Sequence, residues 1–298
     1  TLADGVIRYT TNGSEPTVSS GIQYTNPITI SNTTIFRAAT FSGNMLPSTT
    51  ETHTYLFIDQ VLRQPNNPPG FPTGSTIWGG YPSDYEVDPE IVNSQQYSNL
   101  VKPALLSIPT VSIVMNIEDI FGTANGIYTH SSDSTTLYRG PAWERPCSAE
   151  FILTNGETGF QINCGIQIQG NASRNPQKTP KHPFRLLFKG SFGPTSLEYP
   201  VFPGSPVTSF DSLVMRADFN DSWLHWDQTQ RLYGTRIRDA WGKETARDMG
   251  MAAPHNRFFH LYLNGLYWGV YEFSEKIDAS FAANYFGDKK SDYDAIAS

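Results

Sequence analysis

A group of basic residues surrounds a turn in the middle of the chain. Gly170 and Arg174 precede the turn, and Lys178, Lys181 and Arg185 lie in it or follow it. Cations at a turn between two predicted strands can bind phosphate groups, although a cationic loop is more often a solvated face. Neither GxxxxGK[ST] nor GxGxxG occurs, so the sequence predicts no Walker loop and no dinucleotide-binding turn.

A second group of candidate residues lies on the segment 228–249, which we predict as one helix. Asp227 is suited to cap it and Gly250 to end it. At about 100° per residue, the face that we expect to be buried carries Tyr233, Ala240, Trp241, Glu244 and Asp248. Buried carboxylates need a cation or a hydrogen-bond network. A structural ion pair, or a helix end that turns both acids back to solvent, is favoured over a catalytic role for Glu244 and Asp248.

Other acidic and histidine residues predict no metal site. The acids that follow Asp218 fail as a calcium loop, because Trp223 and Thr229 occupy the positions that require Gly and Glu. The six His residues lack HExxH spacing, and no GxSxG motif occurs. The zinc-protease and serine-hydrolase classes are therefore not supported.

The two cysteines bracket a predicted β-hairpin. With Asn155-Gly156 as a two-residue type I′ turn, Cys147 lies opposite Cys164. A disulfide and two buried free thiols both remain open at this point. A disulfide would indicate an oxidising, extracytoplasmic compartment, whereas two cysteines alone make a poor zinc site.

The elements that must position these residues follow from composition. The 298 residues are enough for about two domains. Charged residues make up 16%, aromatics 13%, and the net charge is −7 without a basic run, so the chain is expected to fold and not to bind nucleic acid or an anionic membrane. No apolar stretch is long enough to span a bilayer. Because the chain starts at Thr1 without a signal peptide, we expect it to be an internal piece of a longer protein.

The predicted fold class is α+β, with three segments. Alternating short apolar runs predict a small β-sandwich at 1–58. A Pro- and Gly-rich linker follows at 59–104, whose Phe71, Trp78 and Tyr81 are expected to pack on a neighbouring domain. Residues 105–298 predict a mainly antiparallel sheet with a packed helix.

Several motifs between about residues 105 and 298 resemble, in order, the CotH (spore-coat protein H) kinase family. They are GIYTH, WERP, IQIQGNASRNPQKTPKHPFRLLFK, LVMRADFNDSW, TRIRDAWGKETARDMG and LYLNGLYWGVYEFSEKID. Residues 1–57 are similar to the C-terminal β-sandwich of chitobiase and β-hexosaminidase, without its first strands.

The resemblance implies the N-terminal lobe of an atypical protein kinase that binds ATP with Mg²⁺ or Mn²⁺. Its substrates would be Ser or Thr of extracellular or cell-surface proteins. Lys181 matches the lysine that contacts ATP, and Glu244, with Asp248 as the alternative, takes the place of its partner acid. The residues assigned to ATP binding in this way are Gly170, Arg174, Lys181, Glu244, Tyr271 and Glu275, with Glu272 beside the last two.

The chain also departs from the kinase pattern. Asp278 has Ala283 where a catalytic loop needs Asn, and Asp218-Phe219-Asn220 precedes the helix that should come before a DFG motif. No catalytic residue is assigned, and we expect the fragment itself to be inactive. The alternative is a non-catalytic pseudokinase or a surface scaffold that binds carbohydrate through the β domain. Exposed aromatics would favour that alternative, and Tyr9, Tyr24 and Phe36 are typical of a core instead.

Overall fold

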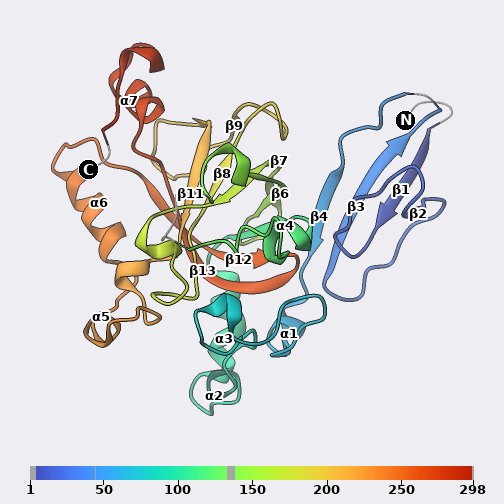
Figure 1. Cartoon of the computed structure of the whole chain (residues 1–298), viewed down its shortest axis with the longest axis horizontal. Coiled ribbons are helices and arrows are strands. Elements are labelled where there is room, and N and C mark those ends of the chain that lie inside the picture. The colour runs from blue at the N-terminus through green and yellow to red at the C-terminus, as the bar shows by residue number, and fades with distance from the viewer. Residues whose placement is uncertain (1–4, 44, 133–137, 297–298) are drawn as a thin grey trace.

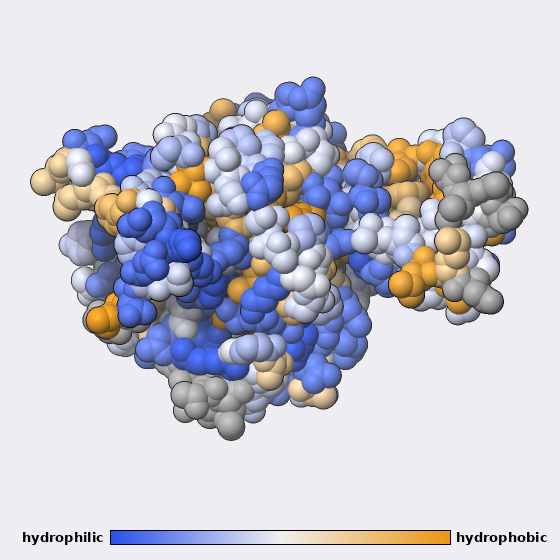
Figure 2. Space-filling view, turned by 90° about the horizontal axis from the view of Figure 1, so that it is seen from above, coloured by the Kyte–Doolittle hydropathy of each residue, from blue (hydrophilic) through white to orange (hydrophobic). Residues whose placement is uncertain are grey.

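Four antiparallel strands near the amino terminus form a sheet beside the rest of the molecule (Figure 1). The computed structural model describes residues 5–43, 45–132 and 138–296, and in these ranges the strand order is β2-β1-β3-β4. The strands are β1 (Val6–Thr10), β2 (Ile22–Gln23), β3 (Thr34–Phe41) and β4 (Glu51–Tyr55). Buried and half-buried residues alternate along β3, as in a strand with one covered face. The expected antiparallel strands are present as one sheet, which Figure 2 shows as part of a projecting lobe, and the bounds of the predicted domain stay a prediction.

In the described residues, seven further strands close into a barrel of order β11-β13-β12-β5-β6-β7-β8. They are β5 (Thr110–Val114), β6 (Arg145–Ile152), β7 (Thr158–Ile168), β8 (Phe184–Leu187), β11 (Ser212–Arg216), β12 (Asn256–Leu263) and β13 (Leu266–Ser274). Neighbouring strands are antiparallel except β5 and β12, which are parallel. The α+β class and the mainly antiparallel sheet are confirmed. The closure of the sheet into a barrel was not predicted. The alternation of apolar and polar residues shows which face of a strand is buried, but not which strands pair with one another.

Short elements connect the barrel strands. A small sheet pairs β9 (Leu197–Glu198) with β10 (Ser209–Phe210). The α-helices are α1 (Ile58–Val61), α2 (Pro89–Val92), α3 (Ser98–Ser107), α4 (Ile117–Phe121), α5 (Gln228–Leu232), α6 (Arg238–Asp248) and α7 (Ala279–Phe286). The 3-10 helices are Thr76–Trp78, Pro141–Trp143, Ala172–Arg174, Phe219–Asp221 and Lys290–Asp292. Within the described ranges, no helix combines the length and the apolar character needed to cross a membrane.

Aromatic side chains of neighbouring strands pack against one another in the main core. The rings of Phe259 and Phe273, on neighbouring strands, have centroids 4.3 Å apart, and Phe151 stacks on Phe160 at 5.4 Å. Tyr271 is fully buried among them. Such cross-strand pairs hold the register of the sheet as well as filling its interior.

The segment predicted as a linker packs on the barrel through its aromatic residues. Trp78 and Tyr85 are buried in the main core, and Phe71 packs against it. Tyr81, which we also expected to pack, is 47% exposed. The fully described run from 65 to 82 contains no strand and no α-helix, as its Pro and Gly content predicts. This packing brings Trp78 and Tyr85 to the wall of a cavity described below.

The hairpin of β6 and β7 has the predicted register but not the predicted turn. Cys147 pairs with Cys164, and Phe151 pairs with Phe160. At the turn, the Leu153 N–H donates to the Glu157 carbonyl at 2.8 Å, so three residues rather than two form the loop. Gly156, with φ of 85°, takes the left-handed position of that loop. A bulge after Phe151 compensates for the extra residue and restores the predicted pairing.

Residues 228–249 form two helices, α5 and α6, instead of the single predicted helix. The carboxylate of Asp221, from another part of the chain, accepts the N–H of Thr235 at 2.7 Å and that of Arg238 at 2.9 Å. Arg236 between them is left-handed, with φ of 62°. An external carboxylate that binds free N–H groups caps a new helix at that point, which explains the break.

Candidate functional site

Lys181 lies just before β8 and reaches the backbone of β13. Its Nζ donates to the carbonyl of Val270 at 2.7 Å and lies 4.4 Å from the centre of the Tyr271 ring. A Cβ on Gly269, whose φ is 110°, would lie 2.8 Å from this Nζ. Because L side chains rarely adopt this φ, the backbone favours glycine at position 269, and the absence of a Cβ there leaves room for the lysine end.

A second cation converges on the same carbonyl. Nη2 of Arg236 donates to the Val270 oxygen at 2.8 Å. Burial lowers the pKa of Lys181 well below its ordinary value, Arg236 lowers it further, and Asp218 opposes the shift. An anion that approaches these two side chains would stabilise their charged forms.

Asp218 is the carboxylate of this group. It is buried, its Oδ2 lies 3.4 Å from Nη2 of Arg236, and its Oδ1 has no hydrogen-bond partner among the described residues. Burial raises its pKa against the opposing charges of Arg236, Arg216 and Lys181. Its backbone is left-handed, with φ of 52°, a conformation that costs a non-glycine residue roughly 1 kcal/mol and often marks functional sites.

Two ion pairs join α6 to the barrel next to Asp218. Nζ of Lys243 lies 3.2 Å from Oε1 of Glu272, and Nε of Arg216 lies 3.1 Å from Oδ2 of Asp239. Glu272 is fully buried, and its Oε2 has no hydrogen-bond partner in the described part of the chain. Burial raises the pKa of Glu272 to about 7, although Lys243 lowers it. This carboxyl group therefore titrates near neutral pH.

Two cavities adjoin these groups. The charged cavity, of about 490 Å³, is lined by Arg216, Asp218, Asn220, Asp221, Arg238, Asp239, Gly242, Lys243, Ala246 and Ala253. The aromatic cavity, of about 240 Å³, is lined by Trp78, Tyr81, Pro82, Asp84, Tyr85, Glu86, Tyr128, Pro180, Lys181, Leu224, Tyr267 and Trp268. Lys181 lines the aromatic cavity. Asp218, whose charge raises the pKa of Lys181, lines the charged cavity. The group of Lys181, Arg236 and Asp218 thus links the two.

Gly170 and Arg174 line neither cavity. The Arg174 guanidinium is buried and donates to the carbonyls of Ile168 at 2.5 Å and Tyr138 at 2.7 Å. Burial lowers its pKa to about 10. These contacts give Arg174 a structural role in its loop, and its contact with ATP stays a prediction.

Glu244 and Asp248 are exposed, so the prediction that they lie on the inner face of the helix is wrong. The helix rests on the barrel through charged residues, and its apolar Trp241 is 67% exposed. The predicted pairing of Glu244 with Lys181 is wrong for the same reason. The carboxylate whose charge opposes the lowering of the Lys181 pKa is Asp218, which follows β11.

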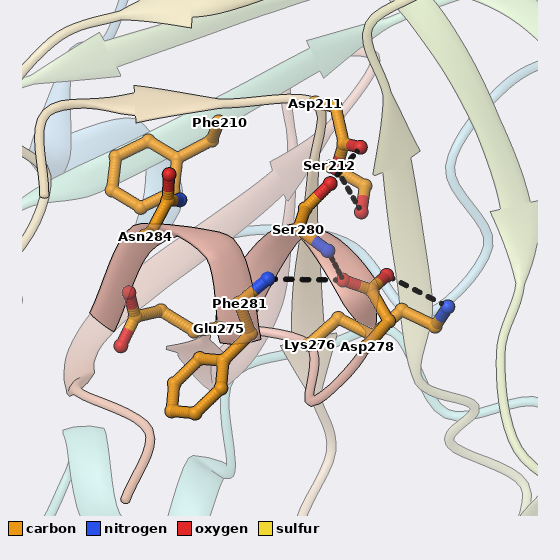
Figure 3. Close-up of a pocket in the computed structure, with 9 residues that line it drawn as sticks. All are labelled: Phe210, Asp211, Ser212, Glu275, Lys276, Asp278, Ser280, Phe281 and Asn284. Atoms are coloured by element: carbon orange, nitrogen blue, oxygen red, sulfur yellow. Dashed lines mark hydrogen bonds and ion pairs between the residues drawn. The ribbon is translucent and has the colours of Figure 1, made fainter. Parts of the chain in front are cut away.

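Glu275 lines a separate, water-sized pocket of about 20 Å³ beside α7, shown in Figure 3. Its Oε2 accepts the N–H of His255 at 2.7 Å and the hydroxyl of Tyr285 at 2.8 Å. Glu275 lines neither cavity near Lys181. Tyr271, by contrast, contacts the ammonium group of Lys181 with its ring, and its hydroxyl donates to the His182 carbonyl at 2.9 Å.

The cysteines are free and buried, with their Sγ atoms 3.6 Å apart. Burial raises the pKa of the Cys147 thiol well above its ordinary value, so it is protonated at neutral pH. The observed register leaves both the disulfide and the thiol pair open.

The sequence prediction did not assign Asp218, Arg236 or Lys243 to the site. The signal for Asp218 was its place in the cluster of acids that failed as a calcium loop. Among the described residues, no group of three or more His, Cys, Asp and Glu side chains is arranged to hold a metal ion.

A lysine, an arginine and a buried aspartate between two cavities can bind anionic groups such as phosphates. Residues 166–296 match the family model described as CotH kinase protein, and residues 2–55 match the one described as Fn3 associated. Residues 166–296 are therefore a CotH kinase-family region, as the motifs within this range predict, and the resemblance of residues 105–165 stays a prediction. The chitobiase resemblance stays a prediction. No curated protein matches the chain.

Proposed function

We propose that this chain binds ATP as part of an extracellular or cell-surface kinase that transfers the γ-phosphate to Ser or Thr of proteins. The observation that carries the proposal is the convergence of two cations on one carbonyl. Nζ of Lys181 and Nη2 of Arg236 lie 2.7 and 2.8 Å from the Val270 oxygen, beside the buried Asp218. Phosphate oxygens would compensate this enclosed positive charge.

Different residues of the site would contact different parts of a bound nucleotide. Lys181 and Arg236 would bind phosphate oxygens, while Lys243, which lines the charged cavity, holds the buried Glu272. The unpartnered Oδ1 of Asp218 fits Mg²⁺ or Mn²⁺ in the mode in which one carboxylate and the phosphates share the metal. A bound metal would neutralise phosphate charge.

Replacing Lys181 with methionine is expected to weaken ATP binding by roughly tenfold to a hundredfold, because a charge-assisted contact is lost. Isothermal titration calorimetry with MgATP measures the dissociation constant. Lys102→Met is the matched control, since Lys102 forms an exposed ion pair with Asp59 outside both cavities. Equal affinity of wild type and Lys181→Met would contradict the proposal.

The second candidate function is a non-catalytic surface scaffold that binds carbohydrate. Tyr9 and Phe36 stack at 5.1 Å and are half-buried, and Tyr24 is 43% exposed, so these three do not form a closed core. The strand register places all three on one face of the amino-terminal sheet. Such a row of aromatics suits stacking against sugar rings. A chain that binds no ATP in the titration above would favour this function.

We also propose that Cys147 and Cys164 form a disulfide in an oxidising compartment. Treatment with oxidised glutathione is expected to join the two sulfurs, while two protons and two electrons pass to the glutathione disulfide. The intact mass would fall by that of two hydrogen atoms, and the denatured protein would show no free thiol. The variant Cys147→Ser should keep its single thiol or form a mixed disulfide. Two free thiols in the oxidised wild type would exclude the bond.

A further inference from the structure

The aromatic cavity next to Lys181 has walls of an unusual composition. Trp78 and Tyr85 come from the segment 59–104, and Trp268 comes from β13. Their ring centroids lie 5.8 to 6.0 Å from one another. The volume of about 240 Å³ is large enough for a flat ring system but not for a whole nucleotide.

One wall of this cavity carries a hydrogen-bond donor without a partner. Trp78 is only 7% exposed, and its indole Nε1 is buried with no hydrogen-bond partner among the described residues. An indole N–H can only donate, and a buried donor left unpaired is costly. A ligand that places an acceptor atom in the cavity would supply the missing partner.

The charged residues around the aromatic cavity are unevenly distributed. Asp84 and Glu86 are exposed lining residues, whereas Lys181 is half-buried and adjoins Arg236. A ligand with a neutral ring and a negatively charged tail would therefore direct the tail towards Lys181 and away from the two acids.

We propose that the aromatic cavity binds the purine base of the nucleotide, with an acceptor atom of the base receiving the N–H of Trp78. The inference rests on the proposed function, because it takes the phosphates to lie at Lys181. Trp78 and Tyr85 lie outside the CotH-matched region at 166–296. The preceding segment thus supplies base recognition to a phosphate site that the kinase-family region provides.

Calorimetric titration of the full chain with ATP, with inorganic tripolyphosphate and with adenosine separates the two parts of the site. Wild type is expected to bind ATP at least about tenfold more tightly than tripolyphosphate, because stacking and the indole bond add to the phosphate contacts. Trp78→Phe keeps a ring but removes the donor. It should weaken ATP binding roughly three- to tenfold and leave tripolyphosphate binding unchanged.

Trp241→Phe is the matched control, because Trp241 is 67% exposed and lines neither cavity. Equal affinities of wild type for ATP and tripolyphosphate would overturn the base site while leaving the phosphate site intact. The same conclusion would follow if Trp78→Phe weakened both ligands by one factor. If tripolyphosphate binding does not depend on Lys181, the proposed function fails instead. The wild-type comparison needs no variant, so it decides the matter even if Trp78→Phe folds poorly.

Discussion

Asp221→Ala is expected to lower the free energy of unfolding by about 3 kcal/mol, because the carboxylate holds the start of α6. It accepts the N–H groups of Thr235 and Arg238, and one of its oxygens lies 3.2 Å from the Arg238 guanidinium. Hydrogen bonds to a charged group contribute roughly 1.5–3 kcal/mol each, and their losses overlap when one acceptor is removed. Urea denaturation at pH 7 measures the effect.

Asp227→Ala is the matched control for this variant. Asp227 caps α5 through one hydrogen bond, to the Gln230 N–H at 3.0 Å, so its loss should cost only about 1 kcal/mol. Equal losses for the two variants would show that Asp221 is an ordinary cap. Asp221→Ala should also weaken ATP binding, since α6 carries residues of the charged cavity.

The Asp221 variant has a defined pH dependence. Burial favours the protonated carboxyl, but the bonds from Thr235 and Arg238 together outweigh it and lower the pKa of Asp221. Stability that comes from a lowered pKa is present above the ordinary value of about 4 and is lost as the pH falls. The difference between wild type and variant should therefore shrink in acid.

Raising the pH from 5 to 8 is expected to destabilise wild type relative to Glu272→Gln by roughly 2–3 kcal/mol. The pKa of Glu272 is raised from 4.5 to about 7 in the folded protein. Its stabilising contribution is therefore present below the unfolded value and is lost as the pH rises through 7. Each unit of pKa difference corresponds to about 1.4 kcal/mol. The charged groups that face Glu272 are Lys243, Asp239, Arg216 and Asp218.

Denaturation at several pH values between 5 and 8 measures this dependence. The substitution also changes the uncharged contacts of this side chain by an amount that does not depend on pH, so the slope is the informative quantity. Glu244→Gln on the exposed side of α6 is the matched control and should run parallel to wild type. If the profile of Glu272→Gln also runs parallel to wild type, Glu272 is ionised in the folded protein throughout this range.

Local rules predicted the parts of the fold that depend on neighbours in sequence. Asp227 caps α5 as expected, and Gly250, with φ of 83°, follows the end of α6. The assumed turn at Asn155-Gly156 predicted the pairing of Cys147 with Cys164, which holds because the bulge after Phe151 compensates for the longer loop. The break before α6 could not be predicted in this way, because its cause is the carboxylate of Asp221 on a different element.

In the candidate site, too, the features that depend on neighbouring residues could be predicted, and those that depend on distant parts of the chain could not. Lys181 could be identified from the motif that surrounds it, since the motif is continuous in sequence. Asp218 could not be identified in this way, because its interactions with Arg236 and Lys181 join residues that are far apart in the sequence. Trp78 reaches the aromatic cavity through the packing of a Pro- and Gly-rich segment, which has no periodicity to indicate its position.

The parallel pairing of β5 with β12 has a consequence for biosynthesis. While a ribosome makes the chain, β5 emerges long before β12, so one edge of β5 keeps bare N–H and C=O groups until the C-terminal hairpin is translated. The amino-terminal sheet can assemble at once from adjacent strands, whereas the barrel waits for its last partners. Nascent chains halted before β12 should therefore be prone to aggregation and should depend on chaperones.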